Sequence, residues 1–396
     1  MTQDDPIVIA GLARTPMGGF QGELSDAPAS ALGATAIEAA LTRAALAPDA
    51  VQEVVFGCVL PAGQGQAPAR QAAIGAGIPV DAGATTVNKM CGSGMKAAMF
   101  AHDMLMAGST EIAVAGGMES MSNAPYLLPQ MRGGTRIGHG KALDHMFFDG
   151  LGDAYDKGRL MGSFAEDCAE SYQFTREAQD AYAIGSLERA QAAIAAGAFS
   201  TEIAPFTLRG RKGETQVSED EQPGRARPEK IPSLKPAFRE GGTVTAANSS
   251  SISDGAAALV LMRRSEAERR GLTPLAAIRG HASRAKAPNL FPTALIGALR
   301  KLEERSGWSL KDVDLFEINE AFAVVAMAAM RDLDLPRDKV NVHGGACALG
   351  HPIGASGARI LVTLLAALEK YDMKRGIASL CIGGGEATAM AIERLA

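Results

Sequence analysis

The 396-residue sequence has no run of 18 consecutive apolar residues, the length that a membrane-spanning helix needs. A basic, cleavable leader is also absent, because Met1 to Pro6 lead directly into a short apolar strand. We therefore expect a cytoplasmic protein with no membrane partner. Basic charge is not in excess either, since 39 Lys and Arg face 44 Asp and Glu. This balance argues against nucleic acid as a partner but leaves room for a local basic patch that binds a small anion.

The cysteine pattern of a disulfide-rich or zinc-binding protein is missing as well. The five cysteines are an odd number without a Cys-x-x-Cys pair, which argues against a disulfide framework and against a zinc site of that kind. They are Cys58, Cys91, Cys168, Cys347 and Cys381. Neither G-x-x-x-x-G-K-[ST] nor G-x-G-x-x-G after the first strand occurs, so the sequence does not support a P-loop or a Rossmann dinucleotide site. We therefore expect free thiols.

The chain does contain strands and helices that alternate along its first third. The predicted strands are Ile7–Leu12, Val51–Val59, Thr85–Asn88 and Glu111–Gly117. The predicted helices between them are Ala29–Ala45, Ala69–Gly77 and Met95–Gly108. This alternation predicts an α/β fold whose mostly parallel sheet is covered on both faces. At 396 residues the chain is long enough for two or three packed units.

A diverged internal repeat organises the rest of the chain. A strand at Leu275–Gly280 and a helix at Thr293–Ser306 restart the order of the first elements. Three matches then follow at an offset of roughly 260 to 267 residues: residues 307–317 with 45–56, the Ser-Gly turn after Lys339–Val342 with that after Thr85–Asn88, and the strand at Ile377–Gly384 with that at Glu111–Gly117. The segment between the copies is richer in Pro, Gly and charge, apart from a helix at Thr175–Gly197, and is interpreted as a subdomain over the site. We predict a first unit of residues 1–120 completed by 243–272, an inserted subdomain of residues 121–242, and a second unit of residues 273–396. The completing segment is predicted to contain strands at Thr243–Asn248 and Ala256–Met262.

Cys91 is the first candidate for chemistry. It lies between the strand at Thr85–Asn88 and the helix at Met95–Gly108, next to a Gly-Ser-Gly turn. Free N–H groups and the dipole at a helix N-terminus favour a thiolate, so we expect its pKa to be below the ordinary ~8.5. The alternative is a cysteine that only packs, which is the commoner role of a free cysteine.

Three further stretches combine reactive groups with small residues. Asn319 and Glu320 follow a strand, and could equally cap the next helix; His343 and His351 lie in a glycine-rich loop, and could be structural. Cys381 precedes three glycines, and could belong to the core. The repeat superimposes the Cys91 loop on the His351 loop, which predicts a Cys–His pair for covalent acyl transfer. Cys381 beside them is suited to acid/base work toward carbon.

Several blocks together make the chain resemble the thiolase family, most closely its acetyl-CoA acetyltransferase type. They are Val87-Asn-Lys-Met-Cys-Gly-Ser-Gly-Met-Lys, Gly116-Gly-Met-Glu-Ser-Met-Ser, Asn248-Ser-Ser-Ser-Ile-Ser-Asp-Gly, Asn319-Glu-Ala-Phe, Gly350-His-Pro-Ile-Gly-Ala-Ser-Gly and Cys381-Ile-Gly-Gly-Gly. The resemblance covers essentially the whole length. It implies the thiolase fold, two duplicated α/β units layered α-β-α-β-α with an inserted loop subdomain.

The resemblance also implies roles for single residues. Cys91 is then the acylated nucleophile, His351 activates it, and Cys381 deprotonates the second acyl-CoA. Asn319 holds a water that forms one oxyanion hole with His351, and the N–H groups of Cys91 and Gly383 form the other. The implied coenzyme A and acyl contacts are Ser250, Ala321, Phe322, Leu151 and Met161. For the 3′-phosphate of coenzyme A the candidates are Arg225, Arg227 and Lys230.

The implied reaction is a reversible, ping-pong Claisen condensation of two acetyl-CoA to acetoacetyl-CoA and coenzyme A, in lipid metabolism. The resemblance also implies no metal and no permanently bound cofactor, with coenzyme A as substrate and product. Leu160 stands where biosynthetic members usually have histidine, so a degradative 3-ketoacyl-CoA thiolase with broader chain length stays open. An inert coenzyme A or lipid-binding protein of the same fold is a further alternative. Glu386 is another departure from the pattern, and only an indirect role at the site suggests itself. The family implies a homotetramer, a dimer of dimers, with Pro125–Gly140 as a contact loop.

Overall fold

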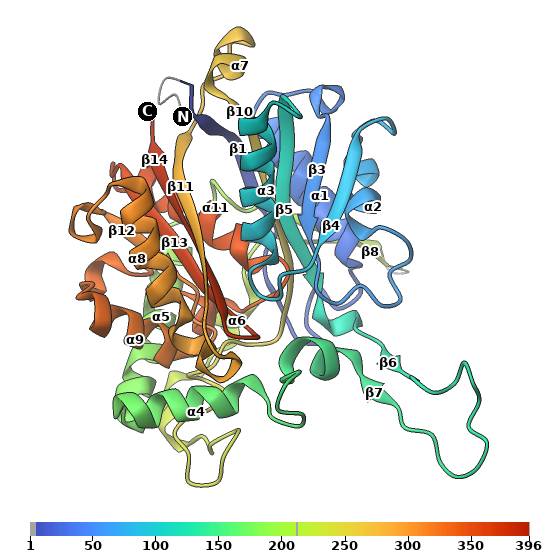
Figure 1. The fold of residues 1–396 in the computed structure, drawn as a ribbon, viewed down its shortest axis with the longest axis vertical. Coiled ribbons are helices and arrows are strands. Elements are labelled where there is room, and N and C mark those ends of the chain that lie inside the picture. The colour runs from blue at the N-terminus through green and yellow to red at the C-terminus, as the bar shows by residue number, and fades with distance from the viewer. Residues whose placement is uncertain (1–4, 211–212, 396) are drawn as a thin grey trace.

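The computed structural model describes residues 5–210 and 213–395, which form a ten-stranded mixed sheet with helices on both faces (Figure 1). The strands that carry the sheet run in the order β12-β13-β14-β11-β1-β10-β5-β3-β4, and β2 (Gly18–Gly19) pairs with β10. In the first half the strands are β1 (Ile7–Arg14), β3 (Glu53–Gly57), β4 (Gly83–Val87), β5 (Ile112–Ser120) and β10 (Ser253–Arg263). In the second half they are β11 (Ala276–Ala285), β12 (Leu315–Ile318), β13 (Arg375–Ile382) and β14 (Glu386–Arg394).

Both halves of the sheet have the same connectivity. In the first, β4, β3, β5, β10 and β1 follow one another from the edge to the joint; in the second, β12, β13, β14 and β11 do so. Val340 makes a single parallel bridge to Phe316 of β12, at the place that β4 occupies beside β3. The halves meet where β1 pairs with β11 through Val8 and Ile9.

The helices divide the molecule into layers, in agreement with the expected α-β-α-β-α order. Helices α3 (Ser93–Ala107) and α11 (Ser356–Lys370) pack on each other and on strands of both halves, so they form the central layer. The outer layers are α1 (Ala29–Arg43) with α2 (Pro68–Gly75), and α8 (Ala294–Ser306) with α9 (Ala323–Leu333). Small and branched side chains fill α11, whose residues 356–368 are all buried.

The segment between β5 and β10 holds α4 (Met161–Tyr172), α5 (Arg176–Ala195), α6 (Glu221–Arg225), short helical turns at Met146–Leu151 and Pro228–Ser233, and two hairpins, β6 (Tyr126–Leu127) with β7 (Leu143–Asp144) and β8 (Phe206–Gly210) with β9 (Gly213–Val217). Within this segment, α4 and the β6–β7 arm lie at one end of the sheet, whereas β8 lies at the side of the first half (Figure 1). The arm beyond β6 and β7 extends away from the body (Figure 1). In the described part of the chain, no helix is long and apolar enough to cross a membrane.

Two expectations about strands were wrong. The sheet is not mostly parallel: only β3 with β4, β3 with β5 and β12 with β13 are parallel, because β10 and β14 enter antiparallel between their neighbours. The predicted strand Thr243–Asn248 is a loop. There Asn248 Oδ1 accepts from the Thr245 N–H at 2.7 Å, a local side-chain bond that replaces a strand ladder.

Candidate active site

Cys91 lies in a tight turn between β4 and α3. Met90 adopts a left-handed φ of 47°, and the turn is held by two side chains: Asn88 Oδ1 accepts from the Met90 N–H at 2.9 Å, and Ser93 Oγ donates to the Met90 carbonyl at 2.6 Å. The helix α3 starts at Ser93, so Cys91 precedes it as the sequence predicts.

The loop of His351 stands opposite, at the start of α11. A Cβ on Gly94 of α3 would lie 2.7 Å from the Ala358 nitrogen of α11, and a Cβ on Gly357 would lie 2.4 Å from the Met95 nitrogen. The two Ser-Gly turns of the repeat therefore touch, and only glycine permits this approach. The contact brings the Cys91 turn and the His351 loop to the same cavity.

Hydrogen bonds fix the imidazole of His351. Ser356 Oγ donates to the Pro352 carbonyl at 2.9 Å, so its lone pair accepts from His351 Nδ1–H, 2.5 Å away. This assignment leaves Nε2 with a free lone pair, the form that a general base needs. The amide nitrogen of Asn319 lies 3.5 Å from Nε2, and Asn319 Oδ1 is buried with no hydrogen-bond partner among the described residues.

A second thiol lies next to the first. Cys381 is near the end of β13 and only 1% exposed, and the chain then turns through Gly384 and Gly385, which both have φ near +90° (89° and 87°), into β14. The N–H groups of Gly383 and of Cys91 itself face the Cys91 sulfur and favour its charged form. The two thiols and the two backbone N–H groups thus meet at the end of β13 and just before the start of α3.

Burial decides the charge of these groups. It raises the pKa of the Cys91 thiol to about 11, although the N–H groups of Gly383 and Cys91 lower it. The expected lowering of this pKa was wrong, because the cost of removing a thiolate from water exceeds the gain from the donors. Burial and then the charge of Arg359 lower the pKa of His351 to about 3, and burial followed by the nearby Cys91 raises the pKa of Cys381 well above its usual value. At neutral pH all three groups are uncharged.

One cavity of about 360 Å³ joins these residues. Nine residues that the sequence predicts as catalytic or as contacts of the acyl and pantetheine groups line it: Cys91, Leu151, Met161, Ser250, Ala321, Phe322, His351, Cys381 and Gly383. The other candidates do not line it; they are Asn319, Glu320, His343, Arg225, Arg227 and Lys230. The remaining wall is mostly apolar and comes from segments far apart in the chain: Met121, Phe147, Gly150, Leu160, Gly162, Ala237, Phe238, Ala246, Ser249, Ser251, Ile252, Phe291 and Ile353. Its size and its few polar groups fit a small acyl chain with a polar attachment.

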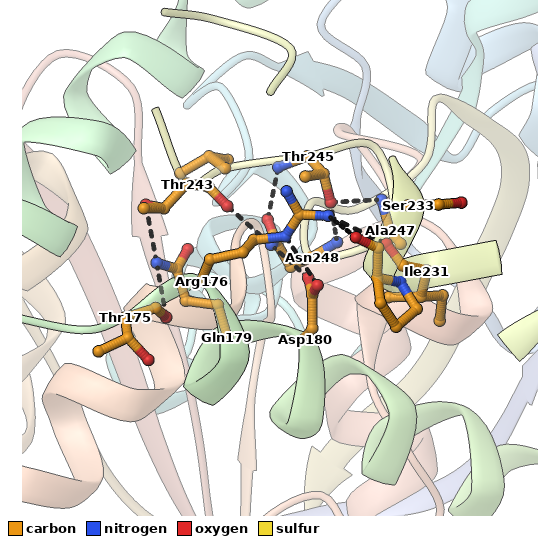
Figure 2. Close-up of polar contacts among 12 residues, drawn as sticks. Thr175, Arg176, Gln179, Asp180, Ile231, Ser233, Thr243, Thr245, Ala247 and Asn248 are labelled. Carbon is orange, nitrogen blue, oxygen red and sulfur yellow. Dashed lines mark hydrogen bonds and ion pairs between the residues drawn. The ribbon is translucent and has the colours of Figure 1, made fainter. Parts of the chain in front are cut away.

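The loop that carries Ser250 is anchored to α5 by a polar network (Figure 2). Asp180 on α5 accepts from Asn248 Nδ2 at 3.0 Å and from Arg176 Nε at 2.7 Å, and Arg176 also donates to the Ile231 carbonyl at 3.0 Å. Beyond Asn248, the Ser250 N–H and hydroxyl both donate to the Ala321 carbonyl at 3.0 Å. The network thereby fixes one wall of the cavity.

Sequence reasoning missed several residues that shape the site. Glu119 accepts from the N–H groups of Val59, Leu60 and Gly354 at 2.9 to 3.1 Å, and so ties β5 to the His351 loop. Its burial raises its pKa to about 7, although these N–H groups lower it. Glu119 does lie within a quoted motif, which was an available signal. The aromatic wall and the network around Asp180 had none, because only the fold brings those segments together.

Glu386, which had no explanation at the sequence level, forms an ion pair with Lys89. Lys89 precedes Cys91 by two residues, and Glu386 follows the turn that contains Gly383. The pair therefore connects the two segments whose N–H groups face the Cys91 sulfur. Both side chains are partly exposed, at 25% and 38%.

Comparisons with known proteins agree with this arrangement. The family described as "Thiolase, N-terminal domain" matches residues 7–265, and "Thiolase, C-terminal domain" matches residues 272–394. Acetyl-CoA acetyltransferase 2 of Arabidopsis thaliana is 53% identical over 98% of this chain and 97% of its own length, and acetyl-CoA acetyltransferase of Cupriavidus necator is 50% identical over 98% and 99%.

Solved structures give the same result. The acetyl-CoA acetyltransferase of Bacillus anthracis superimposes with a TM-score of 0.96 at 41% identity over 98% of this chain and 99% of its own. The Acat5 thiolase of Ascaris suum, whose structure contains coenzyme A, superimposes with a TM-score of 0.93 at 41% identity over 98% and 100%. Family, sequence and fold coincide over nearly the full length, and the chain belongs to the thiolase family.

Proposed function

We propose that the chain is an acetyl-CoA C-acetyltransferase that condenses two acetyl-CoA to acetoacetyl-CoA and coenzyme A, and runs the reverse thiolysis. The observation that carries this proposal is the meeting of two thiols, Cys91 and Cys381, with the base His351 in one apolar cavity. One thiol suffices for acyl transfer. A reaction that also removes a proton from carbon needs a further acid/base group, and the second thiol can serve as that group.

In the first half-reaction, the Cys91 sulfur attacks the acetyl-CoA carbonyl and its proton passes to His351 Nε2. The bond from the acetyl carbon to the coenzyme A sulfur breaks, and the departing sulfur takes the proton of Cys381. This leaves acetyl-Cys91, with an imidazolium and a thiolate beside each other. Because Cys91 and His351 are both neutral at rest, attack and proton transfer occur together rather than through a preformed thiolate.

In the second half-reaction, the Cys381 thiolate takes a proton from the methyl of a second acetyl-CoA. The resulting carbanion attacks acetyl-Cys91, the new carbon–carbon bond forms, and the Cys91 sulfur leaves with the proton of His351. The N–H groups of Cys91 and Gly383 stabilise the oxyanion on the acetyl group. The enolate oxygen accepts hydrogen bonds from His351 and from a water that Asn319 holds. Asn319 Oδ1 is free to bind this water, since it has no other partner in the described chain.

We further propose that Ser250, Ala321, Phe322, Leu151 and Met161 contact the acyl and pantetheine parts of coenzyme A, because they line the cavity. Coenzyme A enters as substrate and leaves as product, and the reaction needs no permanently bound cofactor or metal. Arg227 and Lys230 are exposed and suit a phosphate, whereas Arg225 already pairs with Glu221.

A thiolysis series tests the proposal. We expect turnover of acetoacetyl-CoA that falls steeply with 3-ketohexanoyl- and 3-ketooctanoyl-CoA, and no turnover by Cys91→Ser. Cys381→Ala should form acetyl-Cys91, seen by mass spectrometry, yet neither condense nor exchange the methyl proton. Condensation by this variant would remove Cys381 from the mechanism, and coenzyme A binding without any turnover would support the inert alternative.

A broader 3-ketoacyl-CoA thiolase is the second candidate, and Leu160 favours it. Leu160 lines the cavity, where it contributes an apolar side chain at a position for which the sequence comparison expects a histidine. A flat rate across the three chain lengths would establish this candidate. Leu160→His should then restore a preference for four carbons.

We also propose that the protein is a cytoplasmic homotetramer. Within each chain we propose three units: residues 1–120 completed by 243–272, residues 121–242, and residues 273–396. The β6–β7 arm supports the assembly, because Leu128, Met131 and Ile137 on it are 53%, 55% and 96% exposed. Light scattering on the full chain and on a variant lacking residues 128–142 tests this: a tetramer for the first and a dimer for the second are expected.

A further inference from the structure

A cluster of two histidines and an aspartate lies outside the catalytic cavity. His102 and Asp103 are on α3, and His281 is on β11, so the cluster spans the two halves of the sheet (Figure 1). It lines a separate groove of about 1020 Å³ whose wall also contains Trp308 and Arg305. The reaction proposed above uses none of these residues.

The geometry of the cluster is compact. Asp103 Oδ1 lies 3.0 Å from His102 Nδ1 and 2.9 Å from His281 Nε2, and the two imidazole rings meet edge to face with centroids 5.0 Å apart. Each residue offers one atom that could bind a metal ion, and these three atoms all lie within 4.8 Å of one another. The histidines are mostly buried, with 17% and 12% of their side chains exposed, whereas Asp103 is 56% exposed.

We propose that His102, Asp103 and His281 bind one divalent transition-metal ion of the Zn²⁺ type. Two imidazole nitrogens and a carboxylate oxygen are a common three-residue ligand set for zinc, and a fourth position open to the groove takes water. Tetrahedral Zn²⁺ with bonds of about 2.0–2.2 Å places its ligand atoms roughly 3.3 Å apart. The two nitrogen–oxygen distances are already within a few tenths of an ångström of this value. Only the distance between the two imidazole nitrogens has to shorten for a tetrahedral ion to bind.

Two features around the cluster lower the expected affinity. A metal on Nε2 of His281 leaves the opposite ring nitrogen, Nδ1, without a hydrogen-bond acceptor in the described part of the chain. This nitrogen is buried, and among the described residues the ring is held in place only by packing and by Asp103. The groups around the cluster are mainly basic: Arg305 donates to the His281 carbonyl at 3.0 Å, Arg279 is paired with Glu393, and Lys96 lies one to two turns along α3. Their charge weakens attraction for a cation, so we expect micromolar rather than nanomolar affinity.

The consequence of such an ion is mechanical. It ties α3, which begins just after the Cys91 turn, to a strand of the second half. A ligand that binds only the folded state raises the melting temperature, and at about 100 times its dissociation constant the rise for a chain of this size is about 3 °C. Acetoacetyl-CoA thiolysis should be unaffected by the loss of the ion, so failure of this proposal is distinct from failure of the proposed function.

The test is Zn²⁺ binding to the full chain by equilibrium dialysis and thermal denaturation, with Co²⁺ absorption to identify the ligands. We expect one ion per chain, a higher melting temperature, a tetrahedral Co²⁺ spectrum without thiolate bands, and affinity at least about tenfold lower in His102→Ala, Asp103→Asn and His281→Gln. His139→Ala, which removes an exposed histidine far along the chain, should bind as the parent does. Equal binding by all four variants, thiolate bands, or no binding would overturn the proposal.

Discussion

Replacing Ser356 by alanine tests how His351 is held. Ser356 is fully buried and its hydroxyl is the hydrogen-bond partner of His351 Nδ1 at 2.5 Å. When His351 becomes charged during acyl transfer this bond is charge-assisted, and such bonds contribute about 1.5–3 kcal/mol. If that energy is lost in the transition state, kcat should fall roughly 10- to 150-fold. KM should change little, because Ser356 does not line the cavity.

Steady-state thiolysis of acetoacetyl-CoA measures this effect, and urea denaturation separates it from loss of folding. Ser379→Ala is the matched control: this serine is equally buried and donates to the Thr388 carbonyl at 2.9 Å, but is not bonded to His351. The control should lose stability of about 1 kcal/mol and keep its kcat. A folded Ser356→Ala enzyme whose kcat stays within about twofold of the parent would refute the argument.

Three further predictions concern charge, packing and the ion pair. Because Cys91 and His351 have pKa values of about 11 and 3, neither should cause an inflection in kcat/KM for acetyl transfer between about pH 5 and 9. Over the same range, the rate of iodoacetamide labelling of Cys91 should rise about tenfold per pH unit, because the thiolate fraction does. Gly94→Ala should lower stability in urea by about 1–3 kcal/mol through overpacking, whereas Gly185→Ala, whose Cβ meets nothing within 4 Å, should be neutral or stabilising. Glu386→Gln should cost less than about 1 kcal/mol of stability, since the pair is partly exposed, and should make kcat less sensitive to added salt.

The sequence determined the positions of most helices and strands, because an apolar face repeats with the period of its element. The helices after Pro28 and Cys91 and the core of β10 lie where their patterns predict them. Internal repetition was also readable, since both copies keep a Ser-Gly turn before a small-residue helix. The catalytic candidates could be identified because reactive side chains stood in glycine-rich motifs.

Three features were decided only by the tertiary structure. Strand direction depends on which strands become neighbours, and no local period encodes that, so the sheet was expected to be more parallel than it is. The charge of Cys91 depends on how much water the fold removes, and desolvation outweighs the donors that the sequence indicates. The wall of the cavity joins Phe147, Phe238 and Phe291, which lie far apart in the chain. Their proximity comes from packing, and packing is a property of the whole fold.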